Sequence, residues 1–577
     1  MDIQWLIGGE AGYGIMTTGV MMAKIFTRLG MSVFDYVEYP SLIRGGHNVY
    51  YVRGSEEEIF SQKKEVDILV ALNRETIDKH KGELSSDALV LYDPDFTKAD
   101  QSEFPSTIQL IPVPLLKLTK EVKADKLMIN TVAVGASLAL FYKDYSVLEG
   151  IIKDIFGKKG EEVVLENINT SKAGFDYVGK NFSDKARPVQ KKEQENLLIS
   201  GAEALSLGAI KAGLKFAAIY PMTPINAILA TLIEHSLAYN IIVKEPEDEI
   251  AGINMAIGAS FAGARSMVAT SGGGFSLMTE ALGLAAQTET PIVIVEGQRP
   301  GPSSGMPTWT DQGDLRFVLH ASQGDFLRVV VAPGDPLEAF IQTMHAFNLA
   351  DKYQIPVIVL VDKYLMEGHA SAKAEEFKIQ SSKFKIDRGK ILSDQEALSE
   401  IDYKRYQFEE DGVSSRSLPG QKGGIALWDS YEHNQKGLYD ETSENRIKMV
   451  DKRFKKSEKL VLDIPEPDFY GEKEADLTIF AFGSTKMPVL EALKILKKEG
   501  KNINFLKVSY LSPFPTKAVE EAIKTAKKTL VLEGNKSGQF ESLIKEHTGL
   551  SIENNFRKYD GRPFYPEEIV EKVKTLI

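Results

Sequence analysis

The most distinctive chemical pattern in this chain is Tyr220-Pro221-Met222-Thr223-Pro224. An apolar run from Leu214 to Ile219, expected to be a strand, precedes it, and a run from Ala227 to Leu237, expected to be a helix, follows it. Such a turn lies at the carboxyl edge of a sheet, where open α/β folds bind ligands. The prolines hold Thr223 at the positive end of a helix, which suits a carboxylate. On these residues alone, a plain turn capped by Thr223 is the alternative.

Further along the chain, Glu245-Pro246-Glu247-Asp248-Glu249 runs into a helix of small residues, and Thr270-Ser271-Gly272-Gly273-Gly274 follows. A strand from Pro291 to Val295 then ends in Glu296-Gly297-Gln298-Arg299. In this order the segments closely resemble the alpha subunit of the 2-oxoacid:ferredoxin oxidoreductases. The fingerprint of that family is a Tyr-Pro-x-Thr-Pro motif followed by an acidic helix start.

The beginning of the chain carries a second possible ligand site. A strand at 3–7 and a helix at 15–29 enclose Gly8-Gly9-Glu10-Ala11-Gly12-Tyr13-Gly14, and such a turn exposes N–H groups to an anion. The spacing is not a clean Gly-x-Gly-x-x-Gly, which disfavours a dinucleotide-binding domain. With Tyr39-Pro40-Ser41-Leu42-Ile43-Arg44-Gly45-Gly46-His47-Asn48 and Asn130-Thr131, the turn resembles the gamma domain of the same family, which carries coenzyme A contacts.

This resemblance implies that Gly9, Gly12, Gly14 and Arg44 bind coenzyme A. Arg44 would be the cation that contacts a phosphate or carboxylate. Two alternatives stay open here. Arg44 could be a solvated loop residue, and the turn could belong to a non-enzymatic nucleotide- or acyl-coenzyme A-binding module.

Length and composition limit the function classes. A chain of 577 residues with 43% hydrophobic residues should hold about three domains. A net charge of -12 disfavours nucleic acid as a partner. No apolar stretch reaches the roughly 18 residues of a membrane span, and the start lacks the basic region of a secretory signal. A cytoplasmic protein is therefore expected.

Two absences from the sequence concern cofactors. There are no cysteines, so the chain cannot hold a conventional iron–sulfur cluster, and no metal site is expected on it. There is also no Gly-Asp-Gly followed by Asn of the kind that thiamine enzymes use to hold magnesium and diphosphate. This disfavours a self-contained thiamine decarboxylase or transketolase.

The expected fold class is α/β, with three doubly wound domains. A polar, charged stretch reads as a linker, and a long segment rich in Lys, Glu, Asp and Ser reads as a surface excursion. The expected order is a gamma domain at 1–182, a linker at 183–197, a pyrimidine- and 2-oxoacid-binding domain at 198–370, the excursion at 371–475, and a transketolase C-terminal-like domain at 476–577.

The family resemblance also implies partners. Thiamine diphosphate would lie between this chain and a beta subunit that carries the magnesium at its diphosphate site and the [4Fe-4S] cluster. Electrons would pass to ferredoxin, coenzyme A would take the acyl group, and the complex would be a heterodimer or heterotetramer.

By the same resemblance, Glu249 matches the glutamate that hydrogen-bonds the aminopyrimidine ring. Glu245, Glu247 and Asp248 compete for this role, and helix register favours Glu249. Thr223 and Arg299 match the residues that hold the 2-oxoacid, beside Tyr220, Pro221 and Pro224. We expect Thr223 and Arg299 at one sheet edge, on consecutive βα turns.

The 2-oxoacid itself is less well determined. A fused gamma–alpha chain is typical of the 2-oxoglutarate type, which we place first, and pyruvate or a branched-chain or aryl 2-oxoacid is the alternative. Many 2-oxoglutarate relatives carry Arg where this chain has Ser322. A second cation for a distal carboxylate is therefore in doubt.

Overall fold

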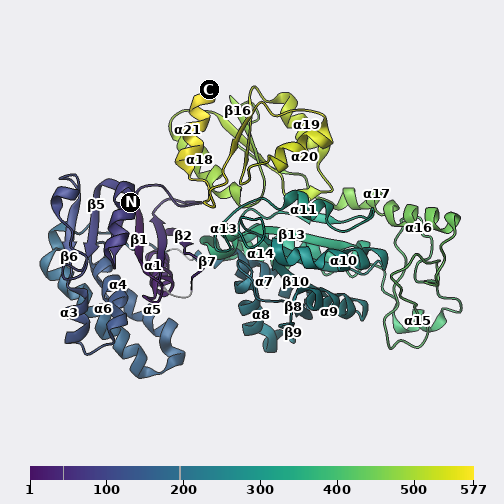
Figure 1. The fold of residues 1–577 in the computed structure, drawn as a ribbon, viewed down its shortest axis with the longest axis horizontal. Coiled ribbons are helices and arrows are strands. Elements are labelled where there is room, and N and C mark those ends of the chain that lie inside the picture. The colour runs from purple at the N-terminus through teal and green to yellow at the C-terminus, as the bar shows by residue number, and fades with distance from the viewer. Residues whose placement is uncertain (43–44, 194–195) are drawn as a thin grey trace.

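The computed structural model describes residues 1–42, 45–193 and 196–577. The chain forms three sheets (Figure 1). Each sheet with the helices that cover it is called a layer: the first, the middle and the third. An irregular extension projects from the middle layer. The expected α/β class with doubly wound domains is confirmed. In the described part of the chain, no helix has both the length and the apolar character needed to cross a membrane.

The first sheet has eight strands in the order β6-β5-β4-β1-β3-β2-β14-β7. Its strands are β1 (Asp2–Glu10), β2 (Ser32–Glu38), β3 (His47–Ser55), β4 (Val66–Ala71), β5 (Leu84–Tyr92), β6 (Gln109–Pro112), β7 (Asn196–Ser200) and β14 (His369–Lys373). Strand β3 runs antiparallel to both β1 and β2. The last two strands come from far along the chain, and they join the first sheet to the middle of the protein.

Helices cover this first sheet: α1 (Ile15–Arg28), α2 (Arg74–His80), α3 (Leu115–Glu121), α4 (Ile129–Ala139), α5 (Ser146–Phe156) and α6 (Glu161–Asn181). Glycines let α4 and α6 pack backbone to backbone. A Cβ on Gly135 would lie 1.8 Å from the Ser171 carbonyl oxygen, and one on Gly174 would lie 2.1 Å from that of Val132. Neither position can therefore hold a larger residue without moving a helix.

The middle sheet has seven strands in the order β18-β12-β13-β11-β10-β8-β9. They are β8 (Phe216–Ala218), β9 (Ile242–Lys244), β10 (Ser266–Ser271), β11 (Ile292–Gln298), β12 (Val329–Val331), β13 (Pro356–Asp362) and the antiparallel β18 (Tyr510–Ser512). The helices between them are α7 (Gly201–Lys211), α8 (Asn226–Tyr239), α9 (Glu249–Phe261), α10 (Gly272–Gln287), α11 (Leu315–His320), α12 (Pro336–Tyr353) and α13 (Lys363–Glu367). All pairs except β12–β18 are parallel, so the strands present their carboxyl ends at one edge.

The third sheet has the order β15-β17-β16-β19-β20, with β15 antiparallel. Its strands are β15 (Asp468–Tyr470), β16 (Leu477–Ala481), β17 (Ile503–Lys507), β19 (Thr529–Glu533) and β20 (Asn554–Arg557), and its helices are α18 (Lys486–Lys498), α19 (Thr516–Thr525), α20 (Gln539–Thr548) and α21 (Pro566–Leu576). A buried ion pair between Arg53 and Glu491 joins this layer to the first one. Arg53 of β3 contacts both Asp2, at 2.6 Å, and Glu491 of α18, at 3.1 Å.

The chain between β14 and β15 contains the helices α14 (Ala374–Lys383), α15 (Asp394–Ser399), α16 (Ser443–Lys455) and α17 (Ser457–Leu460). Helix α14 lies beside the middle sheet, whereas α15 and α16 lie in the projecting extension (Figure 1). It is anchored to the middle layer through Glu289, which precedes β11. Lys452 and Lys456 approach the Glu289 carboxylate at 2.7 and 2.6 Å, and all three side chains are buried.

Candidate active site

The turn of residues 219–225 joins β8 to α8 and contains a cis Thr223–Pro224 peptide. Pro224 is buried, whereas Tyr220 and Pro221 are exposed, so the turn presents one apolar face to solvent. Helix α8 begins at Asn226 with Ile225 as its N-cap residue. The alternative in which Thr223 caps this helix is therefore wrong, and its hydroxyl is available for another contact.

Arg299 lies just beyond β11 and reaches this turn. Its Nη1 donates a hydrogen bond to the Thr223 carbonyl oxygen at 2.9 Å, so the structure brings together the two residues that we expected to hold a 2-oxoacid. One expectation is wrong: β10 lies between β8 and β11, so their turns are not consecutive along the sheet. The length of the arginine side chain spans the intervening strand.

Acidic side chains surround the strand end behind Arg299. Glu296 is fully buried, and neither of its carboxylate oxygens has a hydrogen-bond partner among the described residues. Burial, and then the charge of Asp314, raise its pKa well above the ordinary value. Burial likewise raises the pKa of Asp311 to about 7 and that of Asp362 to about 6. This edge therefore holds several carboxyl groups that resist ionisation.

These acids also affect Arg299. Burial lowers the pKa of its guanidinium, while the charges of Asp314 and Glu296 act in the opposite direction. Sequence reasoning missed Glu296 and Asp314 because they lie apart in the chain. The position of Glu296 at the end of an apolar strand was the one sequence feature that could have indicated its role.

Glu249 is the first residue of α9, and it is 3% exposed. Its Oε1 is buried and lacks a hydrogen-bond partner within the described part of the chain. Asp248 serves as the N-cap, accepting a hydrogen bond from the Ala251 N–H at 2.8 Å, and it is exposed like Glu245 and Glu247. Among the four acids of this segment, Glu249 alone is buried.

The space around the Glu249 carboxylate depends on a glycine. A Cβ on Gly274, near the start of α10, would lie 2.4 Å from Glu249 Oε1 and 2.0 Å from Thr270 Oγ1. Because an unpaired buried carboxylate oxygen is costly, this atom suits a ligand that brings a hydrogen-bond donor. In its hydrogen-bonding chemistry, Glu249 thus fits an N–H donor of an aminopyrimidine cofactor.

The glycines of the turn near the N-terminus differ in backbone conformation and in the space around them. Gly9 lies inside β1, opposite Asn48 of β3, and packs against Leu72 and Ile15. Gly12 and Gly14 have positive φ angles of 98° and 68°, and a Cβ on Gly12 would meet open space. Asn130 braces the turn through a 3.5 Å hydrogen bond to the Gly14 carbonyl oxygen. Arg44 lies outside the described residues.

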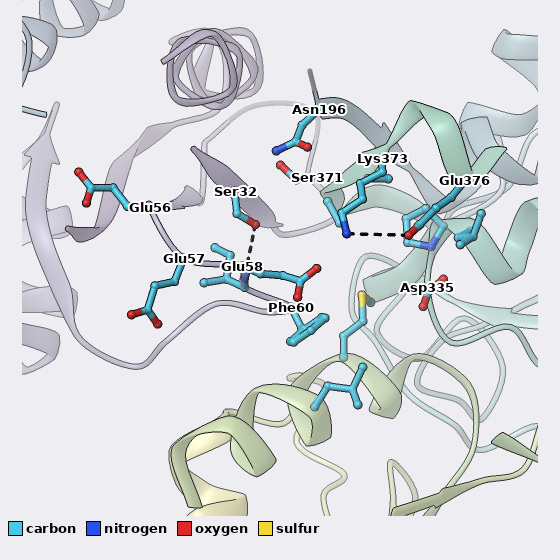
Figure 2. Close-up of a pocket in the computed structure, with 17 residues that line it drawn as sticks. Ser32, Glu56, Glu57, Glu58, Phe60, Asn196, Asp335, Ser371, Lys373 and Glu376 are labelled. Atoms are coloured by element: carbon cyan, nitrogen blue, oxygen red, sulfur yellow. Dashed lines mark hydrogen bonds and ion pairs between the residues drawn. The ribbon is translucent and has the colours of Figure 1, made fainter. Parts of the chain in front are cut away.

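A cavity of about 360 Å³ lies where the first, middle and third layers meet (Figure 2). Its lining includes Glu56, Glu57, Glu58, Asp335 and Glu376. Several of these acids are already paired, as Glu57 is with Lys494 and Lys498. None of the expected site residues lines this cavity, so it is separate from the Thr223 turn.

Comparison with known proteins gives full-length relatives. The 2-oxoacid:ferredoxin oxidoreductase 2, subunit alpha, of Aeropyrum pernix is 32% identical over 637 residues, covering 100% of this chain and 98% of that protein. This chain belongs to the alpha subunits of the 2-oxoacid:ferredoxin oxidoreductases. The 2-oxoglutarate synthase subunit KorA of Methanothermobacter marburgensis is 32% identical over 66% of this chain and 98% of its own length.

Three family models match this alpha subunit. The pyruvate flavodoxin/ferredoxin oxidoreductase thiamine diphosphate-binding model covers 207–452, the pyruvate ferredoxin/flavodoxin oxidoreductase model covers 4–177, and core domain II of pyruvate:ferredoxin oxidoreductase covers 475–569. The first of them contains Thr223, Glu249 and Arg299. The protein is therefore an oxidoreductase with a thiamine diphosphate-binding domain.

A solved structure is similar along the whole chain. The 2-oxoglutarate:ferredoxin oxidoreductase from Magnetococcus marinus, with 2-oxoglutarate, coenzyme A and succinyl-CoA bound, is 32% identical with a TM-score of 0.90. The match covers 100% of this chain and 99% of that one. An alpha subunit implies a complex of several subunits.

Proposed function

We propose that this alpha subunit, with a cysteine-bearing beta subunit, catalyses the coenzyme A-dependent oxidative decarboxylation of a 2-oxoacid and passes the electrons to ferredoxin. The observation that carries the proposal is the buried Glu249 carboxylate, whose Oε1 has no partner among the described residues. Such an atom needs a donor from outside the chain. The fused gamma region and the alpha region would then be parts of one enzyme.

Glu249 has the position to hold a proton at a ring nitrogen of thiamine diphosphate. That cofactor, when bound, supplies the carbanion chemistry of decarboxylation. Gly274 has no side chain that would collide with the Glu249 carboxylate, and the N-cap role of Asp248 fixes the start of α9. Glu249 therefore points in a defined direction, as proton transfer requires.

Thr223 and Arg299 are proposed to hold the carboxylate and carbonyl oxygens of the 2-oxoacid. Arg299 is tied to the Thr223 carbonyl oxygen by one N–H and has further N–H groups in its planar fork. Tyr220, Pro221 and Pro224 would form the wall of the site. A fork held from one side is oriented before the substrate arrives, which lowers the entropy lost on binding.

The remaining components follow from what this chain lacks. With no cysteine, it requires a partner for the [4Fe-4S] cluster, and the partner would also carry the magnesium and diphosphate. Gly12 and Gly14 are the better candidates for coenzyme A contacts, since Gly9 is enclosed within β1. Arg44 is proposed as their cationic neighbour.

We place 2-oxoglutarate first among the substrates, with pyruvate and branched-chain or aryl 2-oxoacids as alternatives. Two relatives at 32% identity are named for 2-oxoglutarate. Ser322 lies against Gly283 of α10, and at 1.5 Å per residue this is about 16 Å along the helix from its start at Gly272. The lack of an arginine at position 322 is therefore a weak argument against 2-oxoglutarate.

The test is to express this chain with and without its beta partner and to follow ferredoxin reduction with a panel of 2-oxoacids. We expect the chain alone to be colourless and inactive, and the complex to be brown and to require coenzyme A. Thermal protection of the complex by thiamine diphosphate checks cofactor binding separately. Turnover by the chain alone, or acyl-coenzyme A binding without any turnover by the complex, would overturn the proposal.

A further inference from the structure

The residues after Arg299 form a loop that returns to its starting point. This loop, 299–314, connects β11 with α11. The N–H of Asp314 donates a 3.2 Å hydrogen bond to the side-chain oxygen of Gln298, the buried last residue of β11. Gln298 is in turn linked to β13, because its side-chain nitrogen donates to the Val361 carbonyl oxygen at 3.4 Å. Since Arg299 directly follows Gln298, it lies at the closed neck of the loop.

Gln312 attaches this loop to the third layer. Its N–H donates to the Gly534 carbonyl oxygen at 2.7 Å, and its carbonyl oxygen accepts from Asn535 Nδ2 at 3.1 Å. Its Nε2 donates to the Phe482 carbonyl oxygen at 3.1 Å. Its Oε1 accepts from the Gly534 N–H at 2.8 Å and from the Thr485 hydroxyl at 3.1 Å. Each backbone and side-chain polar group of Gln312 is therefore bonded to the third layer, and the residue is 3% exposed.

The partners of Gln312 mark a particular place in the third sheet. They lie in the turns that follow the parallel strands β16 and β19. The chain passes from β16 to β17 on one side and from β19 to β20 on the other, so the strand order reverses between β16 and β19. Open α/β sheets bind their ligands in the crevice at such a point. Here a side chain of the same molecule occupies it.

Two glycines shape this crevice around Gln312. A Cβ on Gly483 would lie 3.1 Å from the Nε2 of Gln312, and one on Gly534 would lie 3.2 Å from its Cγ. Both distances are shorter than an ordinary van der Waals contact, so a side chain at either position would crowd Gln312. A crevice that fits a glutamine of its own chain serves to hold that glutamine in place.

The third layer also contacts the loop on either side of Gln312. Gln539 Nε2 donates to the Gly313 carbonyl oxygen at 2.6 Å, and its Oε1 accepts from the Arg316 N–H at 2.8 Å. On the other side, the Arg562 guanidinium lies 3.4 Å from the ring centre of Trp309, which is a cation–π contact. By contrast, residues 301–306 are exposed. The half of the loop that leads back to the neck is therefore fixed by the third layer.

We propose that Gln312 is a positioning residue for the reaction: it ties the 299–314 loop to the third layer and thereby holds Arg299 against the Thr223 turn. This inference rests on the proposed role of Arg299 in binding the 2-oxoacid. It adds that the third layer contributes to substrate binding without touching the substrate. With the neck of the loop released, the substrate would have to order Arg299 itself, and that ordering lowers affinity.

The experiment uses the complete complex with Gln312→Met, and Gln342→Met is the matched control. Gln342 is also buried, and its Nε2 donates to Ser509 Oγ, just after β17, at 3.2 Å. It thus links the same two layers from α12 rather than from the 299–314 loop. We expect Gln312→Met to lower kcat/KM for the 2-oxoacid about 5- to 30-fold and to leave the KM for coenzyme A unchanged. Gln342→Met should keep the wild-type kcat/KM even if both variants lower the thermal unfolding temperature equally.

A double mutant separates positioning from general packing. If Gln312 acts through Arg299, Gln312→Met should cause no further loss in the Arg299→Ala background. Should Gln312→Met fail to assemble, Thr485→Val takes its place: it removes one hydrogen bond to Gln312 and should lower kcat/KM about 2- to 5-fold. An additive loss in the double mutant, wild-type kinetics in the variant that assembles, or an equal loss in Gln342→Met would overturn this inference. A fully active Arg299→Ala would instead overturn the proposed role of Arg299, and this inference with it.

Discussion

Glu289 lies just before β11 and Glu296 lies within it, near its carboxyl end. Both are fully buried, and their pKa values are shifted in opposite directions. Burial alone would raise the pKa of Glu289, but the charges of Lys452 and Lys456 bring it well below its ordinary value. For Glu296, burial and the charge of Asp314 both raise the pKa. The amino end of this strand holds a neutralised charge, and the carboxyl end holds uncompensated acids.

This difference distinguishes buried acids that stabilise the fold from buried acids that are available for chemistry. Paired buried charges have satisfied partners and hold the extension to the middle layer. Acids without partners are tolerated where a ligand or a shifted pKa gives them a use, and such groups gather at functional sites. Glu249, whose Oε1 has no hydrogen-bond partner in the part of the chain that the structure describes, belongs to the second class.

The largest effect on stability should come from removing the ion pairs of Glu289. Glu289→Gln leaves Lys452 and Lys456 buried without their counter-charge, so we expect a loss of about 3–5 kcal/mol in unfolding free energy. Urea denaturation followed by limited proteolysis of residues 384–460 would measure it. The exposed Glu280→Gln on α10 is the control and should stay within about 0.5 kcal/mol. An unchanged midpoint for Glu289→Gln would show that the pairing is unimportant.

Glu249→Gln tests whether an unpartnered acid is used. It keeps the shape but removes the proton-sharing carboxylate, so turnover of the assembled complex should fall on the order of a hundredfold. The exposed Glu247→Gln should be near normal in the same ferredoxin-reduction assay. The reverse pattern would move the role to Glu247.

Arg299→Ala removes the cation that faces the uncompensated acids. We expect kcat/KM to fall roughly 10- to 150-fold for every 2-oxoacid alike, because all share the C1 carboxylate. Arg299→Lys should recover part of the loss, since it offers a point charge in place of a fork. A defect confined to 2-oxoglutarate would make Arg299 a reader of the distal group.

The smallest effect is expected from Glu296→Gln. The folded pKa is raised, so the wild type loses stability as pH rises from the unfolded pKa of about 4.5 toward the folded one. The amide avoids that loss, and we expect a gain on the order of 1 kcal/mol at pH 7 that disappears below about pH 4. Thermal unfolding across this pH range measures it. A destabilised variant at pH 7 would show that Glu296 is ionised and needed.

Local patterns in the sequence predicted much of the site. The strand and helix around Thr223 follow from apolar periodicity and turn residues, whereas Glu249 and Arg299 were singled out by the family resemblance. The acids near Arg299 were not predicted, because Glu296, Asp311, Asp314 and Asp362 meet only when separate strands and loops fold together.

Pairing between strands that are far apart in the sequence could not be predicted either. The sequence reads as three successive blocks, whereas β14 pairs with β2 through Ala370 and Phe34. A short strand has no signal for its partner, because pairing depends on which edge is open after folding. The same reasoning explains why the order β11-β10-β8 was not foreseen.

The borrowed strand β14 also has a consequence for synthesis on the ribosome. Strand β2 is complete at Glu38, but the strand that covers its edge begins at His369, roughly 330 residues later. At ordinary translation rates that interval is on the order of 20 to 60 seconds. During it, the nascent N-terminal sheet exposes an unpaired edge of the kind that attracts other strands. Slow elongation between these two segments should therefore increase aggregation of the newborn chain and its dependence on chaperones.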